Sequence, residues 1–180
     1  MNANTKPLAI GHIKEISLLK RIPDAAAAKI LAEYVKKKTG RMPEIMNTFS
    51  GAMLQSEQGK IFFRDGEIQF EPSPFHVKKV KSWPDEIKAI LKFYASKIYI
   101  AEAKKVLYEH FNVVREQELQ NGGFIFELTP SPDNKEEILR LVVTPNGRIA
   151  AFPVHNKTES AEKWAQEILK TLETKGLVDF

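Results

Sequence analysis

The stretch LRLVVTPNGRIAAFPV, residues 139–154, decides the fold that the sequence predicts. Leucine and valine occupy every second position of its first half, which is the period of a β-strand that buries one face. The Pro-Asn-Gly triplet at 145–147 supplies a tight turn, and residues 149–154 return as the second strand of a hairpin. A helix capped by Thr158 follows. We expect a compact ββα unit that completes a sheet and presents a surface.

Similar turn signals recur along the chain. Asp-Gly at 65–66 and Asn-Gly at 121–122 each separate two apolar runs, and both pairs supply the positive φ angles of a tight hairpin turn. Residues 41–57 are ambiguous, with a short strand as one interpretation of their apolar run. The expected strands are 11–19, 49–54, 61–63, 67–70, 112–119, 122–129, 139–144 and 149–154, and the expected helices are 24–38, 82–110 and 158–176.

This order predicts an α+β fold, because hairpin connections favour antiparallel sheets and the helices are few. The long helix at 82–110 is apolar on two sides, which is typical of a central helix. Two further helices are expected to pack on the sheet. Residues 1–80 form a β-α-β-hairpin part, and residues 81–180 form the long helix, a four-stranded hairpin part and the C-terminal helix. We expect the two parts to share one compact unit.

Composition narrows the classes of protein that fit. The chain has 180 residues, 43% of them hydrophobic and 28% charged, which is ordinary for a globular protein. It contains no cysteine, so disulfides, thiolate metal sites and cysteine nucleophiles are excluded. No apolar run approaches the roughly 18 residues of a membrane span, and the first residues lack a signal peptide. A soluble cytoplasmic protein with no membrane association is expected.

Catalytic motifs are missing from the sequence. It has no glycine-rich nucleotide-binding motif, no serine elbow and no HExxH zinc motif. Glu116 and Glu118 point to one strand face and favour a solvated surface over an acid–base pair. We therefore assign no catalytic, cofactor-binding or metal-binding residue. An enzyme stays open as an alternative only if the fold gathers His12, His110 or His155 around Glu116.

The segment HVKKVKSW, residues 76–83, is the best candidate for contact with a polyanion. Its lysines could contact phosphates while an aromatic side chain stacks on bases. The alternative is a basic connector whose tryptophan packs at the start of the next helix. The net charge of +4 fits either interpretation. The candidate residues are Lys78, Lys79, Lys81 and Trp83.

Adjacent phenylalanines at 62 and 63 mark a second candidate surface. A strand directs neighbouring side chains to opposite faces, so one sheet face cannot bury both rings. Either Phe62 or Phe63 is exposed to a partner, or a sheet covered on both sides buries both.

Two stretches resemble families of short proteins without established activity. Residues 94–128 resemble the C-terminal part of an uncharacterised family found in cyanobacteria, algal plastids and other bacteria. Residues 138–172 resemble a companion family of very small proteins with the order strand, Pro-Asp-Gly turn, strand, helix. The matching residues are Tyr94, Ala95, Phe111, Val113, Val114, Glu116, Glu118, Gln120 and Gly122 for the first family, and Thr144, Pro145, Asn146 and Gly147 for the second.

The resemblance implies an adaptor or assembly role beside ATPases of the AAA class, and it implies no functional residue. Our first hypothesis is a non-enzymatic protein-interaction module that binds a protein partner through a sheet face or edge. Exposed strand edges also permit a homodimer. The alternative is a nucleic-acid- or ribosome-associated basic protein that binds through residues 78–83. No cofactor is expected.

Overall fold

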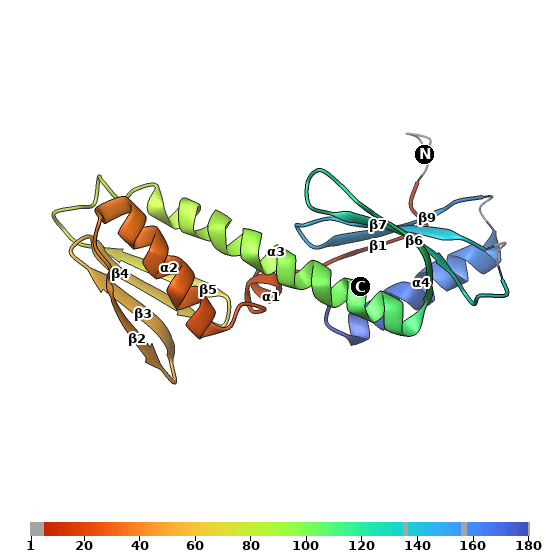
Figure 1. The fold of residues 1–180 in the computed structure, drawn as a ribbon, viewed down its shortest axis with the longest axis horizontal. Helices are drawn as coiled ribbons and strands as arrows, with labels where there is room; N and C mark the ends of the chain where they lie inside the picture. Colours follow the sequence, from red (N-terminus) through yellow and green to blue (C-terminus); the bar gives the residue numbers. More distant parts are fainter. Residues whose placement is uncertain (1–5, 135–136, 156–157, 180) are drawn as a thin grey trace. The chain divides into compact units, whose positions relative to one another are not determined.

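The computed structural model describes residues 6–134, 137–155 and 158–179 (Figure 1). The described residues form nine strands in two antiparallel sheets, together with four helices, one of them long. The expected α+β class is thereby confirmed. The chain divides into two compact units, Ile16–Ala95 and Met1–Glu15 with Ser96–Phe180, and helix α3 (Trp83–His110) contributes residues to both.

The unit Ile16–Ala95 contains a four-stranded sheet in the order β2-β3-β4-β5, and every neighbouring pair is antiparallel. Helix α2 covers one face of this sheet, where Ala27 and Leu31 are buried together with Leu54 and Phe63. Gly40 ends the helix in the left-handed conformation that favours glycine. The bounds are α2 Asp24–Thr39, β2 Glu44–Thr48, β3 Gly51–Ser56, β4 Gly59–Arg64 and β5 Glu67–Pro72.

The expected strand over residues 11–19 is wrong beyond its first two residues. Strand β1 spans Ala9–His12, and the chain then turns into a short helix, α1, at Glu15–Leu19. Leu18 and Leu19 are 3% and 2% exposed. Adjacent residues of a strand point to opposite faces, so one apolar layer cannot bury both, whereas a helical turn places both against it.

The second unit contains a five-stranded antiparallel sheet in the order β1-β9-β8-β7-β6. Its first strand comes from the start of the chain, because Ala9 of β1 lies opposite Ala151 of β9. Helix α4 and the C-terminal half of α3 cover one face of this sheet (Figure 1). The bounds are β6 Asn112–Glu118, β7 Phe124–Thr129, β8 Leu139–Val143, β9 Arg148–Pro153 and α4 Glu159–Thr174.

The core of this unit lies between the covered face and the two helices. Leu141 of β8 and Phe126 of β7 are fully buried, as is Ile168 of α4. Burying one such side chain stabilises the fold by about 1.5–3 kcal/mol. Tyr99 of α3 is also fully buried and donates its hydroxyl proton to the carbonyl oxygen of Leu177 at 2.7 Å, so the ring is buried without an unsatisfied polar group. No helix in the described residues is long and apolar enough to cross a membrane.

The turn between β8 and β9 adopts the conformation that its sequence predicts. Gly147 has a φ of 88°, and its amide donates to the carbonyl oxygen of Thr144 at 3.1 Å. The Thr144 hydroxyl accepts a hydrogen bond from the amide of Arg148 at 3.1 Å. The carbonyl oxygen of Gly147 accepts from the amide of Ile13 at 2.9 Å, which fixes the chain that follows β1 against the turn.

We predict that Gly147→Ala destabilises the protein for two reasons. The positive φ costs any residue with a Cβ about 1–2 kcal/mol, and the new Cβ would lie 2.1 Å from the Cγ2 atom of buried Ile13. Gly176→Ala is the matched control, because Gly176 has a φ of 73° and nothing lies within 4 Å of the position that a Cβ would take there. The free energy of unfolding should fall by at least about 1 kcal/mol more in Gly147→Ala. Equal losses in urea denaturation would contradict the steric argument.

Candidate functional site

The five-stranded sheet has a second face that neither helix of its unit covers, and we call it the open face (Figure 1). Strand register brings apolar side chains from four strands into one line across this face. We call this line the apolar row. It is continued on β6 by Gln117, which lies opposite Ile125. The apolar row consists of Ile10, Ala150, Val142 and Ile125.

The apolar row is partly accessible. Ile10 is 39% exposed, and Val142 and Ile125 are partly exposed, whereas the smaller Ala150 is buried between its neighbours. On the covered face of the same strands, by contrast, Leu141 and Val143 are fully buried. The open face therefore exposes aliphatic surface that another molecule can contact.

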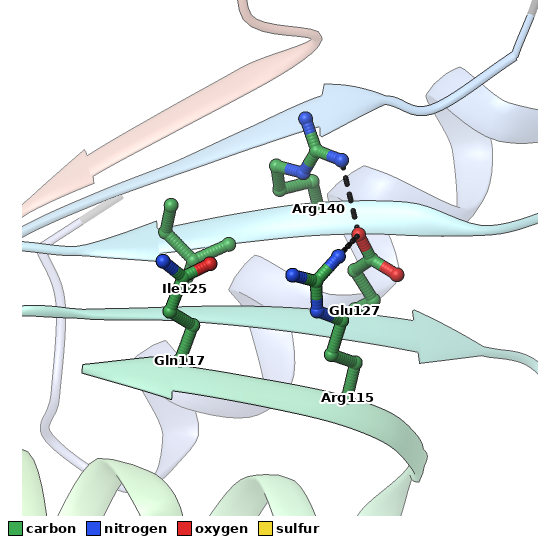
Figure 2. A pocket seen from close by; sticks show the side chains of 5 residues that line it. All are labelled: Arg115, Gln117, Ile125, Glu127 and Arg140. Carbon is green, nitrogen blue, oxygen red and sulfur yellow. Dashed lines mark hydrogen bonds and ion pairs between the residues drawn. The ribbon is translucent and has the colours of Figure 1, made fainter. Parts of the chain in front are cut away.

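A charged row runs beside the apolar row, two residues further along the strands. Arg140 lies opposite Glu127, and Glu127 lies opposite Arg115. One carboxylate oxygen of Glu127, Oε1, is 3.0 Å from Nη2 of Arg140 and 3.7 Å from Nη1 of Arg115 (Figure 2). Two guanidinium groups thus share one carboxylate, and the charged row carries a surplus of one positive charge.

A shallow pocket of about 240 Å³ lies where the two rows meet (Figure 2). Strands β6, β7 and β8 supply its lining, so side chains distant in sequence meet through strand pairing alone. Guanidinium and amide groups can donate hydrogen bonds here while an isoleucine offers apolar contact. The lining residues are Arg115, Gln117, Ile125, Glu127 and Arg140.

The four candidate residues of the basic segment differ in their exposure to solvent. Lys78, Lys79 and Lys81 are exposed, whereas Trp83 is only 5% exposed. The indole of Trp83 packs edge-on against the ring of Tyr34, with 5.5 Å between ring centroids. It also packs at a tilt against the ring of Phe70, with 5.9 Å between centroids. The three lysines are therefore free to meet solvent, but the tryptophan ring is not available for stacking on a base.

Two apolar side chains in the same loop are also exposed. Phe75 is 92% exposed and Val77 is 51% exposed, next to the lysines at 78, 79 and 81. We call residues 73–82 the basic loop. A tight sequence of turns before helix α3 leaves these side chains without a layer to pack on.

A polar cluster fixes the start of helix α3 beside Trp83. The Tyr34 hydroxyl donates to the Glu86 carboxylate, and Lys38 Nζ lies 3.1 Å from Glu86 Oε2. These hydrogen bonds lower the pKa of Glu86, and burial together with Glu86 raises the pKa of Tyr34. The cluster thereby fixes Tyr34, whose ring packs against buried Trp83.

The two adjacent phenylalanines face opposite sides of the four-stranded sheet. Phe63 is 1% exposed on the face that α2 covers, and Phe62 is partly exposed on the other. Strand pairing sets Phe62 beside Met53 and Met53 beside Met46, which is 41% exposed. This second apolar strip is shorter than the apolar row and ends at the exposed edge strand β2.

Glu116 is held in an ion pair by the helix that covers its sheet. Lys104 Nζ lies 2.5 Å from one of its carboxylate oxygens, and the Tyr108 hydroxyl lies 2.7 Å from the other. Both donors lower the pKa of Glu116, and the same contact raises the pKa of Tyr108. In the part of the chain that the structure describes, no three histidine or acidic residues gather as a metal site.

The open face offers aliphatic contact and two guanidinium groups, which together can bind another molecule without changing it chemically. Comparisons with protein-family models, with curated proteins and with solved structures find no match for this chain.

We predict a pH-dependent stabilisation by Glu116. Because its pKa is lowered on folding, the carboxylate stabilises the fold above the pKa of the unfolded chain and loses this effect as the pH falls through the folded pKa. Glu116→Gln should lower the free energy of unfolding by about 0.5–1 kcal/mol at pH 7. Below about pH 4 the difference from the unchanged protein should shrink towards zero.

Glu118→Gln is the matched control on the same strand. Among the described residues Glu118 has no ion pair, so this variant should unfold like the unchanged protein at each pH. Urea denaturation from pH 3 to pH 7 measures both variants. A constant difference for Glu116→Gln over this range would contradict the role of the carboxylate.

Proposed function

We propose that this chain is a non-enzymatic protein-binding module of the cytoplasm, and that its open face receives a segment of a partner protein. The apolar row carries this proposal, because four strands align aliphatic side chains on a face that their own helices leave uncovered. Apolar surface that is kept at a fixed place and rimmed by polar groups is typical of protein-interaction sites.

The charged groups nearby support binding rather than proton transfer. A general acid at neutral pH needs a raised carboxyl pKa, whereas the pKa of Glu116 is lowered by Lys104 and Tyr108. Glu127 is likewise engaged by two arginines. In this proposal Glu127 organises the open face, Glu116 binds helix α3 on the covered side, and neither carboxylate takes part in a reaction.

The resemblance of residues 94–128 and 138–172 to families of short proteins makes an ATPase of the AAA class the first partner to test. The chain would then act as an adaptor that joins such an ATPase to another protein. Strand β2 adds a route to a homodimer, because Ile45 and Met46 are 38% and 41% exposed on an unpaired edge.

We predict that polar substitutions in the apolar row abolish partner binding and leave the fold intact. Ile125→Thr and Val142→Thr keep β-branched side chains, so strand propensity is retained while apolar contact is lost. Affinity capture from native lysate, after nuclease treatment and at moderate salt, should recover a partner with the unchanged chain and lose it with this double variant.

Val77→Thr is the matched control, because it makes the same change at an exposed valine of the basic loop. It should leave capture unchanged. If Val77→Thr loses the partner and the double variant retains it, the binding surface is the basic loop and the proposal for the open face fails.

The basic loop supports a second candidate function, the binding of a single-stranded nucleic acid. Phe75 is 92% exposed beside Lys78, Lys79 and Lys81, which form no ion pair among the described residues. Phe75 would supply the stacking ring, since Trp83 is buried. Both the lysines and the ring that this candidate needs lie in one loop.

If the second candidate is right, replacing all three lysines by glutamate should abolish oligonucleotide binding without unfolding the protein. Three phosphate contacts also predict a slope of about −2 for the logarithm of the binding constant against the logarithm of the salt concentration. The control Lys36→Glu with Lys37→Glu changes charge at the end of α2 and should retain most of the binding. Fluorescence anisotropy at several salt concentrations decides between these outcomes, and unchanged binding in the triple variant rejects the loop.

A further inference from the structure

We propose that Arg115 and Arg140 form a carboxylate-binding site on the open face. The partner segment that fits it is extended and acidic, with an aliphatic side chain two residues away from the acid. This inference rests on the proposed function and adds the chemistry of the partner to it.

The guanidinium groups have donors to spare. Both are directed at a single oxygen of Glu127, while five N–H donors are available on each group. The side chain of Arg115 is 62% exposed and that of Arg140 is 24% exposed, so a ligand can reach both from solvent. Arginine is the side chain that binds a carboxylate through two parallel hydrogen bonds. Here the two arginines flank Glu127, one from β6 and one from β8.

The spacing of the two rows selects an extended segment. Ile125 precedes Glu127 by two residues on β7, and Val142 follows Arg140 by two residues on β8. Residues two apart on a strand lie about 6.6–6.8 Å apart and point to the same face. An extended segment has the same repeat, so its aliphatic side chain can lie on Ile125 and Val142 while its acid reaches the two guanidinium groups.

Charge favours an acidic protein segment over a second copy of this chain. The paired strands direct three arginines, Arg115, Arg140 and Arg148, to the open face and only one glutamate, Glu127. Two copies meeting through this face would bring two positive surpluses together, which opposes association. An acidic segment neutralises the surplus.

A nucleic acid fits the open face less well than a carboxylate does. The apolar row is aliphatic, and the aromatic ring that strand pairing adds to this face, that of Phe152, lies opposite Arg140 and outside that row. Glu127 in the middle of the charged row also repels a run of phosphates. A single carboxylate meets this repulsion only once, and an aliphatic side chain beside it matches the apolar row.

Fluorescence anisotropy of the full-length chain tests this site with two short labelled peptides. One carries Leu-Thr-Asp at its centre, and the other differs only by Asn in place of Asp. The unchanged protein should bind the Asp peptide about tenfold more tightly than the Asn peptide. Arg115→Gln with Arg140→Gln should remove this preference. Arg148→Gln, which removes one positive charge from the same face outside the pair, should keep it.

The double variant leaves Glu127 without its arginines, so its folding is checked by thermal melting. If it unfolds, Arg115→Lys with Arg140→Lys replaces it, because both charges are kept and only the planar donors are lost. The preference for the Asp peptide should then fall to about threefold. A preference that stays at its full value in the lysine variant would overturn the site.

The remaining outcomes separate this site from the proposed function. If both peptides bind equally and Ile125→Thr weakens both, the open face binds protein but the carboxylate site is rejected. If a labelled oligothymidylate binds more tightly than the Asp peptide and depends on both arginines, the ligand is a phosphate and the site as proposed is wrong. If neither peptide binds, the carboxylate site is rejected, while partner capture still decides the proposed function.

Discussion

The one-sided burial of the five-stranded sheet is the constraint on which its unit depends. Leu139, Leu141 and Val143 must face α4 and the end of α3, because these helices offer the apolar surface that covers the strands. The strand period of two then dictates that Arg140 and Val142 point away from the core. A slip of one residue in register would exchange the two sets. The open face is therefore fixed by the same contacts that fix the core.

Local signals in the sequence predict those parts of the fold that form locally. Gly147 has the positive φ that glycine adopts readily in a turn, and the Thr158 hydroxyl accepts from the amide of Ala161 at 3.0 Å as a helix cap should. Strand β1 is different, because its partner β9 lies about 140 positions later in the chain. The sequence pattern around residues 11–19 does not predict that pairing. Leu18 and Leu19 fit the apolar pattern of a strand, and only the apolar layer on which they pack shows that they belong to a helix.

The candidate surfaces also divide into features set by the local sequence and features set by distant contacts. Exposure of the lysines at 78–81 could be predicted, since a basic run before a helix has no apolar layer to enter. The burial of Trp83 could not, because its ring partners Tyr34 and Phe70 come from α2 and β5. The charged row could not be predicted from the sequence either. Arg115, Glu127 and Arg140 are brought together only by the register of three strands.

Stability alone does not account for that row. Partly exposed ion pairs contribute about 0–1 kcal/mol each, and Arg115 at 3.7 Å is the looser of the two partners. The central carboxylate of Glu127 does keep two like charges from repelling one another in the free protein. One carboxylate cannot neutralise two guanidinium groups. The row therefore keeps a positive surplus beside the aliphatic side chains even in the free protein. An acidic segment removes that surplus and covers the aliphatic side chains in the same step, which links the charge of this face to its shape.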